Sequence, residues 1–373
     1  MVFANTVRFV RQSVRTLCSS RSRRIGLAIC DYSRALTSSA VEMDKPKVPK
    51  VLITRPDIPK AALILLRDRY CLRIWDKPEP IPRSTLLSMI HGVDAVFCVL
   101  TDKIDDAILE SAGPQLKVVA SMSVGLDHLD IDSLHKRNIK IGYTPNVLTE
   151  STAELIVALL LATSRKLIHA HLAIYKAEWT SWSPQWMCGR GLAGKTVGIV
   201  GLGRIGLRVA EILKGFNVAE ILYYSRTVKS EASKFDGKRV DFPKLLQDSD
   251  FVIVTVSLTP QTRYMFNSRA FDQMKETAVF VNGSRGEVVD QQALIDALKN
   301  NAIAAAGLDV TTPEPLPLDH ELLNLDNCVV LPHIGSATHE TREEMACITA
   351  KNIMAVLDEC PEEMPAEYKV NVN

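Results

Sequence analysis

The sequence predicts an α/β protein with two doubly wound parallel sheets, one domain being inserted in the other. Apolar runs of strand length alternate with helical runs from about residue 50 to residue 358. A glycine-rich turn interrupts this alternation near residue 203, and a similar unit that ends near residue 145 has no such turn of its own. Strands that alternate with helices form a parallel sheet with helices on its faces, so we expect two such domains.

Composition places the chain among ordinary globular proteins. Its 373 residues are 47% hydrophobic and 23% charged, which is enough for two domains with sizeable cores. A formal net charge of +1 gives no reason to expect a nucleic-acid partner. The apolar run 155–163 is far shorter than the roughly 18 residues that span a bilayer, so we expect no membrane partner. The eight cysteines show no metal-type spacing, which indicates reduced thiols in an intracellular protein and no metal site.

The first 43 residues differ from the rest of the chain. They contain seven arginines, no lysine and only Asp31 and Glu42 as acids, which leaves this segment at +5 and the remainder at about −4. Apolar residues recur every three or four positions and arginines lie on an adjoining face, as in a basic amphipathic helix. The pattern is typical of a mitochondrial transit peptide, and a disordered extension is the alternative. Initiation at Met43 would yield a cytoplasmic form without this segment.

The unit from residue 44 to residue 148 is predicted to form a smaller, substrate-binding domain. Residues 60–69 are its first expected helix, and its strand-like runs are 51–54, 71–75, 95–100 and 116–120. We expect the last helical run, 339–358, to return to this domain. The smaller domain would therefore comprise residues 44–148 and 336–373, with residues 149–335 inserted between them.

A glycine-rich turn follows the strand-like run 196–200. It reads GLGRIG, with glycines at 201, 203 and 206. A helical run and a second strand-like run come next, which is the β-α-β plan of a Rossmann-like dinucleotide-binding domain. Gly201 permits the tight turn, Gly203 lets a pyrophosphate approach the backbone, and Gly206 lets the helix pack on the strand. Arg204 and Ile205, between these glycines, are also expected to contact the cofactor, and the helical run 207–216 that follows offers free N–H groups to the phosphates.

The end of the second strand indicates which dinucleotide binds. NAD sites carry an acid about 20 residues past the glycines, which accepts a hydrogen bond from the ribose 2′-hydroxyl. This chain has Ser225, Arg226 and Thr227 there. With no carboxylate to repel a 2′-phosphate and a guanidinium able to bind one, NADP(H) is the expected cofactor. The alternative is that Arg226 is a solvated surface charge.

Residues 151–177 are predicted to form one long helix that is apolar on nearly every side. Such a helix must be buried, either inside a domain or against another subunit. Three tryptophans, Trp179, Trp182 and Trp186, follow within eight residues. Aromatic clusters of this kind are enriched at protein interfaces, and packing on the domain's own surface is the alternative. We therefore expect a homodimer.

Three later strand ends carry ionisable residues. The strand-like runs after the glycine-rich unit are 251–256, 278–282, 304–310 and 328–331. Arg285, Glu314 and His333 follow the last three of these runs in turn. Ligands of doubly wound sheets lie beyond the carboxyl ends of the strands, so we expect these side chains to meet at one site.

These motifs resemble those of the D-isomer-specific 2-hydroxyacid dehydrogenase family. The resemblance lies in MSVGLDH, GLGRIG, NGSRG, LDVTTPEPLP and LPHIGSAT, and it covers residues 50–368. Within the family, SVGLDHL, WTSW, the Ser-Arg-Thr of residues 225–227 and TTPEPLP are most similar to the glyoxylate/hydroxypyruvate reductases.

The resemblance implies a reductase site. Reduction of a 2-oxo acid needs a hydride donor, a proton donor and a cation for the carboxylate. The matching positions are His333 as the acid, Glu314 as the carboxylate beside it and Arg285 as the cation. Substrate contacts are implied at Val124, Gly125, Arg285 and His333, and cofactor contacts at Ser257, Gly283 and Asp309. His128 and His339 are competing acids, but neither follows a strand end of the dinucleotide domain.

The expected function is NADPH-dependent reduction of glyoxylate and hydroxypyruvate to glycolate and D-glycerate, with a hydride from the nicotinamide and a proton from His333. Two alternatives stay open. One is another D-2-hydroxyacid dehydrogenase, similar to phosphoglycerate dehydrogenase, which the cofactor signal disfavours. The other is a cofactor-sensing binding protein similar to the C-terminal-binding-protein co-repressors, which Ser-Arg-Thr and the N-terminal segment disfavour.

Overall fold

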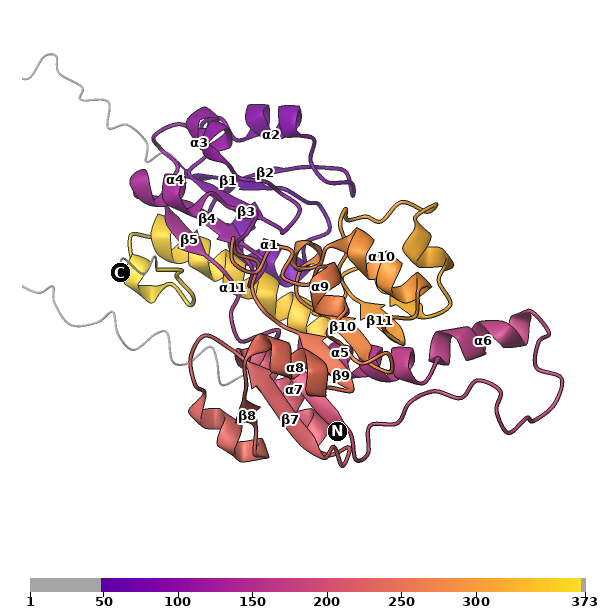
Figure 1. Cartoon of the computed structure of the whole chain (residues 1–373). Helices are drawn as coiled ribbons and strands as arrows, with labels where there is room; N and C mark the ends of the chain where they lie inside the picture. The colour runs from indigo at the N-terminus through magenta and orange to yellow at the C-terminus, as the bar shows by residue number, and fades with distance from the viewer. Residues whose placement is uncertain (1–47, 370–373) are drawn as a thin grey trace, which may run out of the picture. The chain divides into compact units, whose positions relative to one another are not determined.

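The structure is a computed structural model that describes residues 48–369, so the expected targeting segment, 1–43, lies outside the described residues. Two sheets, of five and seven strands, organise the described chain (Figure 1). All of the strand pairs between named strands are parallel, and helices connect most of the strands. The predicted α/β fold class is confirmed.

The first sheet has the strand order β2-β1-β3-β4-β5. Its strands are β1 Lys50–Ile53, β2 Cys71–Ile74, β3 Ala95–Cys98, β4 Val118–Ser121 and β5 Lys140–Gly142, and its connecting helices are α1 Lys60–Arg67, α2 Arg83–Met89, α3 Asp106–Ala112 and α4 Ile131–Lys136. Every residue of β3 and β4 is buried, as expected for central parallel strands that are covered on both faces. The short strand β5 is absent from the strands predicted above, because three residues carry almost no periodicity.

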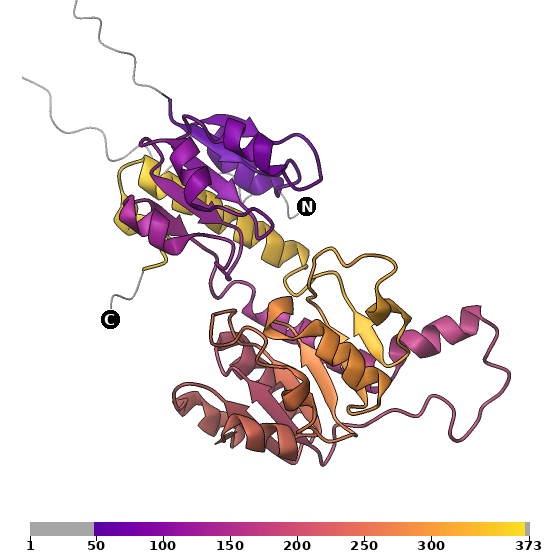
Figure 2. The ribbon, with the colours of Figure 1, turned by 45° about the horizontal axis from the view of Figure 1, so that its top comes forward.

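The C-terminal helix α11, His339–Leu357, packs on this first sheet. Thr338 caps its N-terminus by accepting a hydrogen bond from the Thr341 backbone N–H at 3.1 Å. Ala350 and Ile353 are fully buried in the same hydrophobic cluster as Phe97 of β3. Figure 2 shows α11 in yellow beside the indigo and purple strands. The chain therefore leaves the first sheet, builds the second and returns to the first.

The second sheet has the order β12-β11-β10-β9-β6-β7-β8. Its strands are β6 Thr196–Val200, β7 Glu220–Tyr224, β8 Lys238–Arg239, β9 Phe251–Val254, β10 Val279–Asn282, β11 Ala305–Leu308 and β12 Cys328–Val330. The connections contain α7 Arg204–Lys214, α8 Phe242–Asp248, α9 Ser268–Phe271, α10 Gln291–Lys299 and the 3-10 turns Ser230–Phe235, Gly286–Val288 and Glu321–Asn324. The strand order reverses between β6 and β9, which is where doubly wound sheets bind their ligands.

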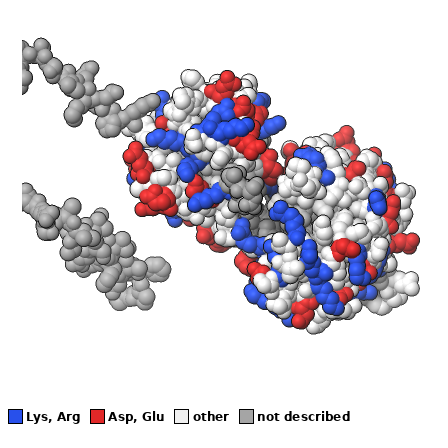
Figure 3. All heavy atoms as spheres, turned by 60° about the vertical axis from the view of Figure 1, so that its left-hand side comes forward, with Lys and Arg blue, Asp and Glu red and all other residues white. Residues whose placement is uncertain are grey.

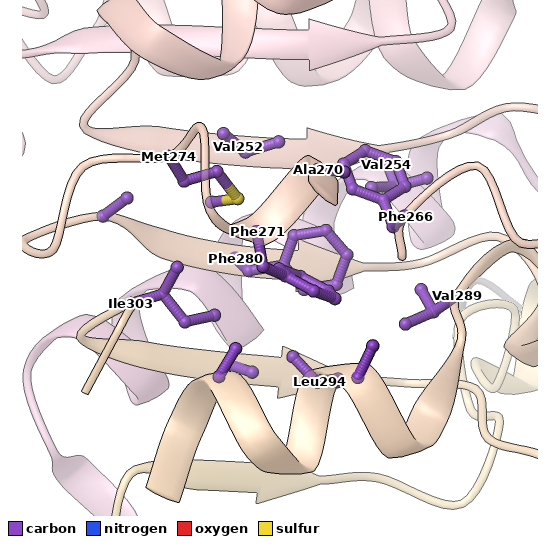
Figure 4. Packing of buried hydrophobic residues seen from close by; sticks show 14 of the residues in the cluster. Val252, Val254, Phe266, Ala270, Phe271, Met274, Phe280, Val289, Leu294 and Ile303 are labelled. Atoms are coloured by element: carbon purple, nitrogen blue, oxygen red, sulfur yellow. The ribbon is translucent and has the colours of Figure 1, made fainter. Parts of the chain in front are cut away.

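Aromatic packing holds β10 in place. The Phe280 ring of β10 lies 5.0 Å from the Phe266 ring and 5.5 Å from the Phe271 ring, and all three side chains are fully buried (Figure 4). Truncating one such ring to alanine typically costs about 3–5 kcal/mol of stability. This cluster gives the strand that leads to Arg285 a rigid base.

The prediction of one long helix over 151–177 is wrong. Helix α5, Thr149–Ser164, ends before a break, and α6, Leu167–Tyr175, continues at 59° to it. Lys166 adopts a left-handed backbone with φ of 52°, and the Ser164 carbonyl accepts a hydrogen bond from the Arg190 N–H at 2.8 Å. The Arg190 N–H of the returning loop thus satisfies the last carbonyl of α5. Carbonyls at the end of a helix need hydrogen-bond donors from outside the helix.

Within residues 48–369, no single helix is long and apolar enough to cross a membrane. Taken together, the bent pair α5 and α6 has the length and the apolar composition of a membrane span. Helix α5 nevertheless packs on β10 and β11, and its Ile156, Leu159 and Leu160 are buried there. On the face seen in Figure 3, acidic and basic side chains are interspersed.

Candidate active site

Three neighbouring strands bring the predicted ionisable residues together. Strands β10, β11 and β12 lie side by side in parallel register. Arg285 follows β10, Glu314 lies in the loop after β11, and His333 follows β12. Parallel strands end at one edge of the sheet, so residues far apart in the sequence become neighbours.

Glu314 orients His333. The Nδ1 atom of His333 lies 2.8 Å from Oε2 of Glu314, and Oε1 of Glu314 accepts a hydrogen bond from the Thr311 N–H at 3.0 Å. Burial would raise the pKa of Glu314, but the hydrogen bond and the charge of His333 outweigh it and hold the pKa below its ordinary value. The carboxylate is therefore ionised at neutral pH, and Nε2 of His333 is left to face a ligand.

Asp309 shapes the backbone around His333. Its two carboxylate oxygens accept hydrogen bonds from the N–H groups of Ile334 and Gly335 at 2.8 and 2.9 Å, and its carbonyl accepts one from the His333 N–H at 2.9 Å. His333 has a left-handed φ of 55°, a conformation that costs a non-glycine residue free energy. Asp309 thus holds the loop in this conformation. Its cofactor contact stays a prediction.

Arg285 lies against the predicted substrate loop. Its Nε donates to both carboxylate oxygens of Asp127, at 3.0 and 3.1 Å, and its Nη1 donates to the Ser284 carbonyl at 2.9 Å. A Cβ atom added to Gly125 would overlap Nη2 of Arg285, so a larger residue at this position would displace the guanidinium. Burial would raise the pKa of Asp127, but the charge of Arg285 lowers it overall. Sequence reasoning missed Asp127, because nothing local pairs it with a residue so far along the chain.

The glycine-rich turn has the shape that a dinucleotide requires. Gly201 has φ of 99°, and a Cβ atom on Gly206 would lie 2.3 Å from the Gly201 carbonyl oxygen. By contrast, a Cβ atom on Gly203 would meet nothing within 4 Å, so the backbone there is open to a ligand. Arg204 and Ile205 form the first turn of α7 beside it. The residues present therefore fit a pyrophosphate.

The remaining predicted cofactor residues lie at the same edge of the sheet. Ser225, Arg226 and Thr227 follow β7 directly, and Ser257 lies just after β9. Gly283 follows β10, but a Cβ atom there would lie 2.5 Å from Ile156 of α5. Packing on α5 therefore accounts for this glycine. Among residues 48–369, no group of His, Cys, Asp and Glu side chains is arranged to hold a metal ion.

A family profile described as "D-isomer specific 2-hydroxyacid dehydrogenase, NAD binding domain" matches residues 157–335. A human protein named glyoxylate reductase/hydroxypyruvate reductase is 49% identical over 326 residues, which are 87% of this chain and 99% of the human protein. The chain belongs to the D-isomer-specific 2-hydroxyacid dehydrogenase family. This dehydrogenase is thus an oxidoreductase with a nicotinamide-dinucleotide-binding domain.

Two further relatives of the dehydrogenase extend the comparison. The glyoxylate reductase of Thermococcus litoralis is 46% identical over 312 residues, covering 82% of this chain and 93% of that protein. A solved structure of the NADPH-dependent glyoxylate/hydroxypyruvate reductase of Sinorhizobium meliloti, in complex with NADP and malonate, superposes with a TM-score of 0.74. It is 29% identical and covers 86% of this chain and 96% of its own.

A hydrogen-bond chain supports the loop of this dehydrogenase that is predicted to bind the substrate. His128 Nε2 lies 2.9 Å from Ser121 Oγ, which lies 2.7 Å from Ser123 Oγ, and Ser123 Oγ donates to the Gly125 carbonyl at 2.7 Å. Since Ser123 uses its proton on Gly125, it accepts from Ser121, which in turn accepts from His128. We therefore assign the Nε2–H tautomer to His128.

His128 is poorly suited to the competing role of general acid. Burial lowers its pKa to about 4, so the ring is neutral at neutral pH. The only local signal of this hydrogen-bond chain is that polar residues begin at Ser121, where the apolar run over β4 ends. His339, the other competitor, is exposed at the start of α11.

Proposed function

We propose that this dehydrogenase reduces glyoxylate and hydroxypyruvate with NADPH, forming glycolate and D-glycerate. The observation that carries the proposal is the convergence of a fixed cation and an oriented histidine at adjacent strand ends. Arg285 contacts Gly125, and His333 is held by Glu314 at 2.8 Å. The named activities of relatives that are 49% and 46% identical support this choice of substrates.

The site residues divide the reaction between them. A reduced nicotinamide, when bound, would supply the hydride for the carbonyl carbon. Arg285 binds the substrate carboxylate through its planar guanidinium, together with the N–H groups of Val124 and Gly125. His333 gives a proton from Nε2 to the carbonyl oxygen as that oxygen becomes a hydroxyl. Ionised Glu314 stabilises the positive imidazolium form before the transfer.

An initial-rate assay tests this function directly. Purified protein would be given NADPH or NADH with glyoxylate, hydroxypyruvate, pyruvate or phosphohydroxypyruvate, and the loss of reduced-nicotinamide absorbance would be followed. We expect the highest kcat/KM with NADPH and the first two acids. Preference for phosphohydroxypyruvate would contradict the proposed substrates. An absence of turnover with tight cofactor binding would favour a sensing role instead.

Replacing Arg226 with alanine is expected to weaken NADPH binding selectively. A lost charge-assisted hydrogen bond costs roughly 1.5–3 kcal/mol, which is about a 10- to 100-fold rise in Kd. The Kd of NADH should change little, because the ribose of NADH carries a neutral 2′-hydroxyl. The Sinorhizobium relative, which was solved with NADP, supports this preference. Direct titration of both cofactors checks the prediction, and an equal loss for the two would mean that Arg226 does not contact the 2′-phosphate.

We propose further that the protein is a homodimer joined through α6 and the loop that follows it. Figure 1 shows this segment extending from the second sheet domain. Its aromatic side chains are open to solvent, with Tyr175 77%, Trp179 60% and Trp182 83% exposed. An exposed apolar segment of this size is typical of a subunit contact.

The variant Tyr175→Ala/Trp182→Ala should shift the sedimentation of the protein toward a monomer. Leu318→Ala is the matched control, because Leu318 is 96% exposed in a different loop and its loss should leave assembly unchanged. A wild-type protein that sediments as a monomer at micromolar concentration would contradict the proposal.

Residues 1–43 are proposed to direct the protein to mitochondria. Their basic, acid-poor composition supports this, and a product that begins at Met43 would stay in the cytoplasm. Sequencing the N-terminus of protein from isolated mitochondria would test the proposal. A mitochondrial protein that keeps Met1 would contradict removal of the segment.

A further inference from the structure

A second arginine is bound to the backbone of the loop 225–227. Arg239 ends β8, the edge strand that pairs with β7, and it is in register with Tyr223. Its Nε and Nη2 atoms donate to the Ser225 carbonyl at 3.2 and 3.1 Å, and Nη2 also donates to the Arg226 carbonyl at 3.2 Å. One side chain thus fixes two consecutive peptides of the loop that follows β7.

This arrangement leaves part of the Arg239 guanidinium available. Within the described chain, Nη1 of Arg239 makes no hydrogen bond, and neither Arg239 nor Arg226 forms an ion pair with an acid at 4.0 Å or less. Both arginines are exposed. A planar guanidinium that is anchored on one side keeps its other N–H groups pre-organised for an anion. One anchored cation, Arg239, and a second arginine, Arg226, therefore belong to the loop region after β7, where a ribose is expected in this fold.

We propose that Arg239 is a second residue that recognises the 2′-phosphate of NADP(H), by donating from Nη1 and by holding the loop that carries Arg226. The inference rests on the proposed preference for NADPH. A phosphate group carries close to two negative charges and three acceptor oxygens, which is more than one guanidinium satisfies. The neutral 2′-hydroxyl of NAD(H) gains nothing comparable from a second cation. Arg239 therefore favours the binding of NADP(H) over that of NAD(H).

The neighbouring Lys238 provides a matched control. Successive side chains of a strand point to opposite faces, and Lys238 Nζ is bound to Glu220 Oε1 at 2.6 Å. Lys238→Ala removes the same unit of charge from the same strand but leaves the hydrogen bonds to the Ser225 and Arg226 carbonyls in place. Any general effect of net charge on anion binding would appear in this variant as well.

The test is a binding titration of NADPH, NADH, 2′,5′-ADP and 5′-AMP to wild type, Arg239→Ala, Arg239→Lys and Lys238→Ala. We expect Arg239→Ala to raise the Kd of NADPH and of 2′,5′-ADP by about 10-fold or more, and that of NADH and 5′-AMP by less than about twofold. The Kd of NADPH in Arg239→Lys should lie between those of wild type and Arg239→Ala, because lysine keeps the positive charge but lacks the planar guanidinium. Lys238→Ala should match wild type.

Each contrary outcome has a separate meaning. If Arg239→Ala raised the Kd of NADPH and the Kd of NADH equally, the inference would be overturned, because Arg239 would then only support the loop. Unchanged NADPH binding would overturn it while the cofactor preference stands. If wild type binds NADH and 5′-AMP as tightly as the phosphorylated pair, the proposed preference itself fails. Should Arg239→Ala not fold, as judged by circular dichroism, Arg239→Lys carries the same comparison.

Discussion

Replacing His333 with alanine is expected to lower kcat with glyoxylate by about 10²- to 10⁴-fold and to change KM little, because a general acid acts in the transition state. The geometry supports this, since Glu314 holds Nδ1 at 2.8 Å and leaves Nε2 to the substrate. Steady-state kinetics with saturating NADPH would measure the effect. His339→Ala is the matched control and should have normal kinetics, because His339 is exposed at the start of α11. A near-normal kcat in His333→Ala would remove the histidine from the mechanism.

The variant Glu314→Gln separates the orienting carboxylate from the acid. Glutamine keeps a hydrogen-bond acceptor near Nδ1 but removes the negative charge that stabilises imidazolium. The pKa of Glu314 lies below its ordinary value, so the wild-type carboxylate stays ionised across the neutral range. We therefore expect the alkaline limb of the pH profile of kcat to move to lower pH in the variant. An unchanged profile would show that the charge of Glu314 does not act on the proton donor.

Substitution of Arg285 by lysine should lower kcat/KM by about 10²-fold or more, although the positive charge is kept. The guanidinium donates to Asp127 and to the Ser284 carbonyl while Nη2 lies on Gly125. A lysine ammonium cannot make these contacts and present a second N–H to a carboxylate at the same time. Initial rates over a range of glyoxylate concentrations would give the value.

A matched variant controls for charge and solvent exposure. Arg263→Lys alters an exposed arginine that pairs with Glu287 at 2.9 Å, and its kcat/KM should equal that of wild type. NADPH binding should be unchanged in both variants, because Arg285 is assigned to the substrate. Wild-type kcat/KM in the Arg285→Lys enzyme would show that the planar fork is unnecessary.

Much of the active-site edge could be predicted from local sequence. The strands that precede Arg285 and His333 are short apolar runs, and the glycines at 201, 203 and 206 follow such a run directly. Parallel strands that alternate with helices end at a common edge. The position of these residues along the chain therefore indicated that they would lie near one another.

Other features needed the packed structure. The break between α5 and α6 depends on a loop that returns 26 residues after Ser164 to bind its carbonyl, as the Arg190 N–H does. Asp127 pairs with Arg285 across 158 positions of sequence. Arg239 reaches the loop after β7 only because β8 pairs with β7. No local periodicity encodes such contacts, because they depend on which elements become neighbours.

Local sequence was enough to predict the α/β class, the glycine turn and the order of Arg285, Glu314 and His333 at successive strand ends. These follow from apolar periodicity and from the backbone freedom of glycine, which are properties of neighbouring residues. Three contacts became visible only in the folded chain: Asp127 orients Arg285, a chain of Ser121, Ser123 and His128 supports Gly125, and Arg239 holds the loop of Arg226. Each of these contacts joins polar atoms from separate turns or strands, so it exists only once the sheets have assembled and brought those atoms within hydrogen-bond distance.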